Sequence, residues 1–207
     1  MAGYTGFFYF IVLIISIMVH EVAHGIVAER EGDPTARLLG RITLNPLKHI
    51  DIVGSIILPL VLLLSGTGMM IGWAKPVPYD PSRLNRGKKS IALVASAGII
   101  ANIMIAVFFG LLIRLSIITH FTSISFISIA SIIVLVNIVL AMFNAVPLAP
   151  LDGYTILQSV LPSRAHKTIA WIEKFSLPIL LVFVVFGWQF VAPLGIKIYI
   201  LITGLAL

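Results

Sequence analysis

Long apolar runs separated by short polar stretches make up most of the 207-residue chain. The runs cover residues 7–28, 54–72, 90–118, 124–146 and 175–192, with a shorter one at 194–207. Most of them reach the ~20 residues that a helix needs to cross the hydrocarbon of a bilayer. No polar stretch is long enough for a soluble domain. The pattern predicts an all-α polytopic membrane protein with about five to six transmembrane segments, built as a single membrane-embedded domain over residues 1–207.

Composition supports this class and narrows the chemistry. The chain is 59% hydrophobic and 11% charged, whereas soluble domains are nearer 45–50% apolar. Its net charge of +6 comes mainly from basic residues in the polar stretches, where they set orientation and contact lipid headgroups, so we expect the lipid bilayer and no nucleic acid as a partner. Cysteine is absent, which leaves His, Asp and Glu as the plausible metal ligands.

The first run contains the sequence His20-Glu21-Val22-Ala23-His24. Side chains at positions i and i+4 lie on one face of a helix, so both imidazoles can bind one metal ion with Glu21 beside them. The alternatives are a chance match, or histidines that hydrogen-bond to neighbouring helices. Three ionisable side chains in the middle of a membrane helix are costly and mark a functional site by default. The spacing therefore favours a zinc site.

A tetrahedral catalytic zinc needs a third protein ligand besides the two histidines. Asp152 follows the run 124–146 after two prolines that break the helix, and Gly153 permits a tight turn. Irregular backbone of this kind can aim a carboxylate into a membrane cavity, although an ordinary loop turn explains the same residues. The other acidic residues lie beside charged, Gly or Pro neighbours: Glu29, Glu31, Asp33, Asp51, Asp80 and Glu173.

Two distant motifs give the chain a family resemblance. His20-Glu21-x-x-His24 is followed by Asn144-x-x-Pro147-x-x-Pro150-Leu151-Asp152-Gly153. In this order they resemble the site-2 protease family of intramembrane zinc metalloproteases, and specifically its compact members without a PDZ domain. The stretches 40–51, 72–78 and 97–102 are similar to the family as well.

The resemblance implies one Zn²⁺ per chain, bound by His20, His24 and Asp152, with Glu21 as the catalytic base. It also implies the reaction, which is hydrolysis of peptide bonds in or near the transmembrane segments of membrane protein substrates, as in regulated intramembrane proteolysis. Zinc lowers the pKa of water in such sites, and a carboxylate base accepts the proton that is released.

Other groups are candidates for acting on the substrate. The amides of Asn144 and Asn102 are available as hydrogen-bond donors to the developing oxyanion, and each can instead serve helix packing. A helical substrate must be extended before its carbonyl can be attacked. Residues 41–51, with β-branched Ile42 and Thr43, are a candidate short β element that pairs with the extended peptide, with a loop that leads into a helix as the competing interpretation.

The charges of the loops predict how His20, His24 and Asp152 come to lie at the same depth in the membrane. Basic residues follow the first run and flank both ends of 54–72, which places these loops in the cytoplasm by the positive-inside rule. Run 54–72 is then predicted to be a re-entrant hairpin instead of a full crossing. Run 124–146 ends on the cytoplasmic side and brings Asp152 level with the histidines. We therefore expect a multi-pass protein of the cell membrane with its active site toward the cytoplasmic side.

Two other classes of protein fit parts of the pattern. A metal transporter also carries His and acidic residues inside helices, but it is expected to spread its ligands over repeated halves, whereas this chain has one compact set. A catalytically silent relative that only binds membrane segments has no physical need for both the ligands and Glu21. Hydrolysis accounts for all of these residues together.

Overall fold

The computed structural model describes residues 2–52, 57, 75–120 and 123–205, and the regular structure in these ranges is helical. Three helices are long and apolar enough to cross a membrane by themselves, and a fourth span runs from α7 into the π-helical η5. Helix α8 is apolar but shorter. The all-α polytopic fold is therefore confirmed, with four spans and α8 in the described part of the chain. The elements are α1 (Ala2–Arg30), α4 (Lys88–Ile118), α5 (Ile124–Asn144), α7 (His166–Val182), η5 (Phe183–Gly187) and α8 (Trp188–Thr203).

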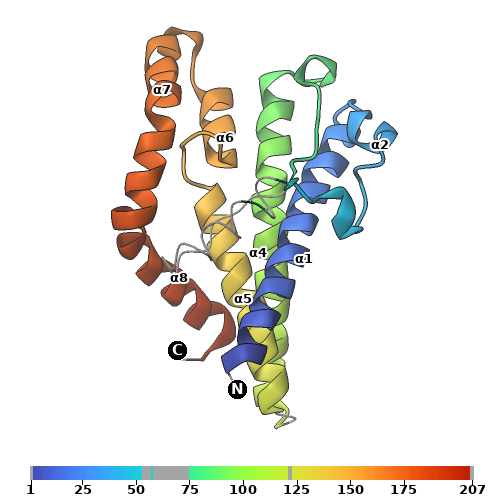
Figure 1. Cartoon of the computed structure of the whole chain (residues 1–207), viewed down its shortest axis with the longest axis vertical. Coiled ribbons are helices and arrows are strands. Elements are labelled where there is room, and N and C mark those ends of the chain that lie inside the picture. Colours follow the sequence, from blue (N-terminus) through green and yellow to red (C-terminus); the bar gives the residue numbers. More distant parts are fainter. Residues whose placement is uncertain (1, 53–56, 58–74, 121–122, 206–207) are drawn as a thin grey trace.

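Helix α4 is the centre of the bundle and contacts α1, α5, α6 (Asp152–Val160) and α8 (Figure 1). Its buried face is rich in small residues such as Ala97, Gly98, Ala106 and Gly110, which let helix backbones approach closely inside a membrane. With 31 residues it is about 46 Å long, which exceeds the ~30 Å of hydrocarbon. One end of α4 therefore extends beyond the apolar layer.

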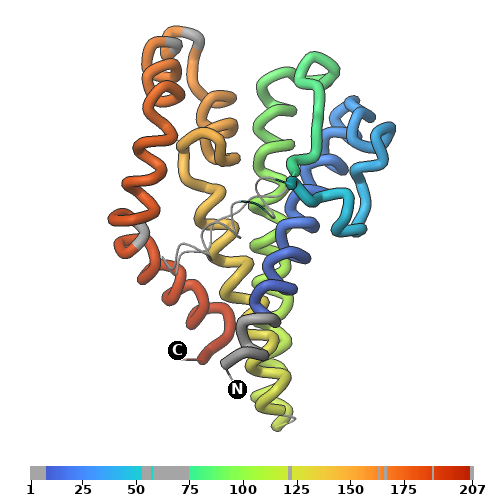
Figure 2. The backbone as a smooth tube through the Cα atoms, in the orientation of Figure 1, coloured from blue at the N-terminus to red at the C-terminus, as the bar shows by residue number. Residues whose placement is uncertain are grey.

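The last helices form a bent rod beside this bundle, with α7 standing apart from α5 (Figure 2). Only 6% of the spanning window in α7 and η5 is buried, against 33% in α1, α4 and α5. The sequence divided this region into apolar runs 175–192 and 194–207. The structure divides it at η5 instead, because α8 begins at Trp188 and continues through Pro193. The irregular turn lies at η5, and such π-bulges are a common cause of helix kinks.

Short elements gather at the end of the bundle where α1 finishes and α4 begins (Figure 1): α2 (Thr35–Leu38), η1 (Pro46–Lys48) and η3 (Pro81–Arg83). Glu31 accepts hydrogen bonds there from the Arg86 guanidinium and from the Ser90 hydroxyl, the latter at 2.6 Å. The bond to Arg86 is the main reason why the pKa of Glu31 lies below its ordinary value. Lys88 Nζ also donates to the Leu161 carbonyl at 3.0 Å. These contacts hold three basic loops together at one end.

The predicted short β element at 41–51 is not formed. Asn45 caps η1 by accepting a hydrogen bond from Leu47 N–H, and Pro46 has no N–H to give to a strand ladder. The ring of His49 bonds back to the Thr43 carbonyl at 2.8 Å, which closes a compact loop. The local side chain to backbone bonds compete successfully with an extended conformation.

The predicted re-entrant hairpin at 54–72 lies, apart from residue 57, outside the described residues. Its described flanks meet, because Lys75 N–H donates to the His49 carbonyl at 2.8 Å. The guanidinium of Arg41 also donates to the carbonyls of Lys75 and Pro76, at 2.8 and 3.1 Å. The two flanks therefore lie on the same side of the bundle, as the loop charges predicted.

Candidate metal centre

Three side chains from two helices converge at one point. His20 and His24 lie one turn apart on α1, and Asp152 is the first residue of α6. Asp152 Oδ2 is 3.0 Å from His20 Nε2 and 3.3 Å from His24 Nε2. Ligands about 2.0–2.1 Å from a tetrahedral zinc ion lie roughly 3.3 Å from one another. The two distances to Asp152 therefore match those that such an ion requires, and all three ligand atoms lie within 4.8 Å of one another. Within the described residues, His20, His24 and Asp152 form the cluster of His, Asp and Glu side chains that could hold a metal ion.

The other nitrogen of each imidazole has a hydrogen-bond partner. His24 Nδ1 lies 2.7 Å from the backbone carbonyl of Val94, and His20 Nδ1 lies 2.6 Å from Asn102 Oδ1. A carbonyl oxygen only accepts, so both Nδ1 atoms donate a proton and both Nε2 atoms present a lone pair toward Asp152. Zinc-binding histidines in proteins are oriented in this way by their outer partners.

The carboxylate of Asp152 shows why this arrangement fits a cation. Its Oδ2 atom is buried and accepts no hydrogen bond, although two lone-pair nitrogens lie close to it. A buried carboxylate oxygen without a donor is costly, and facing it with further lone pairs adds repulsion. A divalent cation between the three atoms removes both costs. Two neutral imidazoles and one carboxylate are a donor set typical of catalytic zinc.

Two glycines allow the ligands to approach. A Cβ atom at Gly98 of α4 would lie 2.5 Å from the His20 ring, so this ring packs directly on the helix backbone. A Cβ atom at Gly153 would lie 2.4 and 2.5 Å from the carbonyl oxygens of Ala145 and Val146. The start of α6, and Asp152 with it, is therefore pressed against the end of α5. Neither position has room for a side chain.

Glu21 is held beside the ligands by the segment that precedes η3. Its Oε2 atom accepts a hydrogen bond of 2.8 Å from Val77 N–H. Two residues further along, Tyr79 packs against a core of Ala28, Leu84 and Val94. Burial raises the pKa of the Tyr79 phenol, and the negative charge of Asp152 adds to this effect. The segment thus places one backbone donor on Glu21 and one phenol within electrostatic range of the ligands.

The two predicted asparagines lie in different surroundings. Asn102 is fully buried, with Oδ1 directed to His20 and Nδ2 donating to Asn137 Oδ1 at 2.8 Å. In the structure it holds a ligand, and its action on an oxyanion stays a prediction. Asn144 ends α5, and its Nδ2 donates to the Leu140 carbonyl of its own helix at 3.0 Å. Its role also stays a prediction.

Sequence reasoning missed several groups around the cluster: Ser16, Val77, Tyr79, Gly98 and Asn137. Of these, Asn137 carried a usable signal, because a polar amide in the middle of a run as apolar as 124–146 marks a functional or interhelical contact. The others could not be found without knowing which helices face each other. Val77, for example, reaches Glu21 from 56 residues away.

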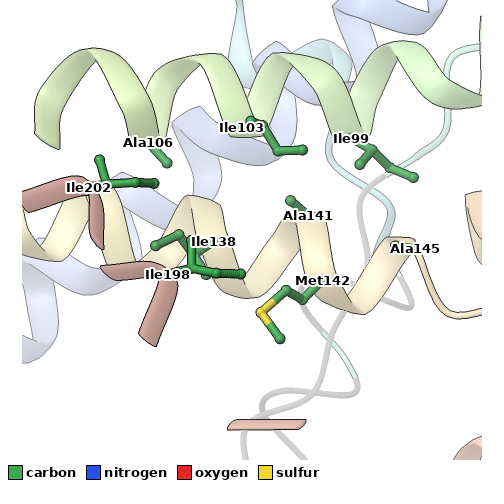
Figure 3. Close-up of a pocket in the computed structure, with 9 residues that line it drawn as sticks. All are labelled: Ile99, Ile103, Ala106, Ile138, Ala141, Met142, Ala145, Ile198 and Ile202. Carbon is green, nitrogen blue, oxygen red and sulfur yellow. The ribbon is translucent and has the colours of Figure 1, made fainter. Parts of the chain in front are cut away.

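A pocket in the described part of the chain lies elsewhere in the bundle. It is formed between α4, α5 and α8, and its lining side chains are all apolar (Figure 3). None of the metal ligands is among the lining residues, which are Ile99, Ile103, Ala106, Ile138, Ala141, Met142, Ala145, Ile198 and Ile202. A pocket without polar groups offers nothing for proton transfer or metal binding, so the chemistry belongs to the ligand cluster.

Comparisons with known proteins identify a family and two relatives for the chain. The family model described as "Peptidase family M50" matches residues 114–187. The chain is 35% identical, over 89% of its own length and 80% of the relative's, to "Putative zinc metalloprotease YwhC" of Bacillus subtilis. It is 29% identical, over 88% of its length and 69% of the relative's, to "Putative zinc metalloprotease Rip2" of Mycolicibacterium smegmatis. No solved structure matches the chain.

Proposed function

This chain belongs to peptidase family M50, and we propose that it is a zinc metalloendopeptidase of the site-2 type. It cuts peptide bonds in or near the transmembrane segments of membrane protein substrates. The observation that carries the proposal is the convergence of two imidazole nitrogens on one buried carboxylate oxygen, at 3.0 and 3.3 Å. His20, His24 and Asp152 bind one zinc ion per chain.

The residues divide the chemistry among them. Bound zinc supplies Lewis acidity, which lowers the pKa of water in its coordination sphere from 15.7 toward about 7. Glu21 is the general base that takes a proton from the attacking water, and it later delivers a proton to the leaving amine. Val77 N–H fixes one carboxylate oxygen of Glu21, which leaves the other oxygen for proton transfer. His20 and His24 stay in the tautomer that keeps Nε2 free for the metal.

The site lies within the apolar part of the bundle. His24 and His20 are six and ten residues before Arg30, the end of α1, which corresponds to about 9 and 15 Å along the helix. Hydrocarbon is ~30 Å thick, so the ligands lie at a depth that a transmembrane segment of a substrate reaches. The basic loops at this end of α1 favour an orientation in the cell membrane with the site toward the cytoplasm.

A metal transporter is the second class of function considered for intramembrane His and Asp. A transport path needs several successive ligand sets. Among the described residues, one such set is present, and Glu21 beside it has a role in hydrolysis and none in coordination. The protease therefore accounts for more of the residues.

The test uses purified full-length protein in detergent with a model transmembrane substrate. We expect Glu21→Gln to abolish cleavage while the zinc content stays at the parent level. Glu29→Gln is the matched control, because it makes the same change on the same helix at an exposed ion pair with Arg37, and it should cleave normally. Equal cleavage by the parent and by Glu21→Gln protein, with zinc bound in both, would refute the mechanism.

A further inference from the structure

A chain of buried hydrogen bonds joins three membrane helices behind His20. Asn102 of α4 lies between His20 and Asn137 of α5, at 2.6 and 2.8 Å. The Nδ2 atom of Asn137 is in turn 2.9 Å from Ser16 Oγ of α1 and 2.8 Å from the carbonyl of Ile133. Neither asparagine has exposed surface. Because water does not reach these amides, their orientations are set by their protein partners alone.

The direction of the chain is fixed at Ile133. A backbone carbonyl only accepts, so the Nδ2 group of Asn137 must face it and Oδ1 must face Asn102. Because Oδ1 of Asn137 is an acceptor, the group of Asn102 that faces it must be the donor Nδ2. The Oδ1 atom of Asn102 is then turned toward His20. The imidazole must then carry its proton on Nδ1. Its Nε2 lone pair is left for the metal.

The two histidines differ in how firmly this tautomer is held. His24 donates directly to the backbone carbonyl of Val94, which cannot exchange its acceptor for a donor. His20 donates to the side-chain amide of Asn102, which presents a donor instead if it rotates by half a turn. An amide turned in that way stabilises the tautomer with the proton on Nε2, and that proton points at Asp152. Such an imidazole cannot bind zinc through Nε2.

We propose that Asn137 is a positioning residue of the zinc site. Acting through Asn102, it fixes the metal-binding tautomer of His20. The inference rests on the proposed zinc site. Loss of an outer hydrogen-bond partner typically weakens zinc binding by 10–100-fold. Asn137 is two hydrogen bonds away from the imidazole, so we expect its loss to weaken zinc binding by about tenfold, the lower end of that range.

The experiment measures the zinc dissociation constant of the full-length protein in detergent by competition with a chromophoric chelator. Asn137→Leu removes the acceptor that faces Asn102. Asn137→Asp, kept as the neutral acid by its complete burial, retains a carbonyl oxygen toward Asn102 and an O–H donor toward the Ile133 carbonyl. We expect the Leu variant to lose about tenfold in affinity and the Asp variant to stay close to the parent. Ser131→Ala is the matched control on α5, because it removes a partly buried interhelical bond of 2.8 Å from Tyr199 away from the metal ligands, and it should bind zinc normally.

Two outcomes overturn the proposal. Parent affinity in Asn137→Leu shows that Asn102 holds its orientation alone, and equal losses in the Leu and Asp variants show a role in packing only. A second measurement does not depend on the variants of Asn137 folding. In metal-free protein with ¹⁵N-labelled histidine, assigned against His20→Gln, the His20 ring should carry its proton on Nδ1, and a proton on Nε2 refutes the inference. Cleavage that still depends on Glu21 in that event leaves the protease function standing.

Discussion

Adding one methyl group at Gly98 tests whether the place of the His20 ring decides zinc binding. In Gly98→Ala the new Cβ would lie 2.5 Å from ring atoms Cε1 and Nε2. Ordinary van der Waals contact begins at 3.4 Å, so the ring must withdraw by up to about 0.9 Å. Zinc–ligand distances tolerate about ±0.2 Å. The displacement exceeds this tolerance several-fold, and the Nε2 atom is itself one of the two atoms that must move most.

The expected result is a large loss of zinc with little loss of folding. An alanine in a helix is favoured over glycine by about 1 kcal/mol, and overpacking a core costs typically 1–3 kcal/mol, so these effects partly cancel in the free energy of unfolding. Zinc affinity has no such compensation, and we expect it to fall by at least the 10–100-fold seen when outer partners are lost. Zinc per chain and thermal unfolding of the same sample measure the two effects separately.

Two glycines elsewhere serve as controls. Gly195→Ala adds a methyl group 3.3 Å from the flexible sulfur of Met142, so both zinc affinity and stability should stay near the parent. Gly110→Ala meets Ile202 Cγ2 at 2.1 Å, so it should lower stability while folded molecules keep their zinc. Parent zinc affinity in Gly98→Ala, with the protein folded, would refute the assignment of this ring to the metal.

Further predictions concern the groups around the ligands. Gly153→Ala should lower both zinc content and thermal stability, because its Cβ meets two backbone carbonyls at 2.4 and 2.5 Å that cannot swing aside; unchanged zinc content would contradict this. Val77→Pro removes the N–H that holds Glu21, so kcat should fall while zinc content, measured by metal analysis, stays constant. The pKa of Glu31 is lowered in the folded protein mainly by Arg86, so its ionised form stabilises the fold above the ordinary carboxyl value of 4.5, and this contribution disappears as the pH falls through the lowered folded value. Glu31→Gln should therefore lower the melting temperature at about pH 7 and leave it almost unchanged in acid. An equal effect at both pH values would argue against the ionic contact.

The apolar runs of the sequence predicted the bounds of the central helices closely. The predicted runs 90–118 and 124–146 correspond to α4 (Lys88–Ile118) and α5 (Ile124–Asn144), because membrane helices must be apolar over their whole span. The C-terminal part was harder. Apolar runs 175–192 and 194–207 are separated by Pro193, but a helix can continue through a proline in a membrane when neighbouring groups satisfy the freed carbonyl. The π-helical turn at η5, where the structure divides the region, has no comparable marker in the sequence.

The candidate ligands could be found because His20 and His24 are neighbours on one helix and Asp152 follows a distinctive proline-rich motif. Their supports could not, because they come from distant parts of the chain. His20 meets Asn102 across 82 positions, and Asn137 meets Ser16 across 121. The short β element failed for a local reason, since β-branched Ile42 and Thr43 favour extension but the cap at Asn45 starts a 3₁₀ turn.

X-ray absorption at the zinc edge of the purified protein tests the central claim most directly. The account predicts one zinc ion per chain with two imidazole nitrogens and carboxylate oxygen at about 2.0–2.2 Å, and loss of this signal in Asp152→Ala. A zinc shell without imidazole in the parent, or an unchanged shell in Asp152→Ala, would contradict the convergence of His20, His24 and Asp152 on one ion.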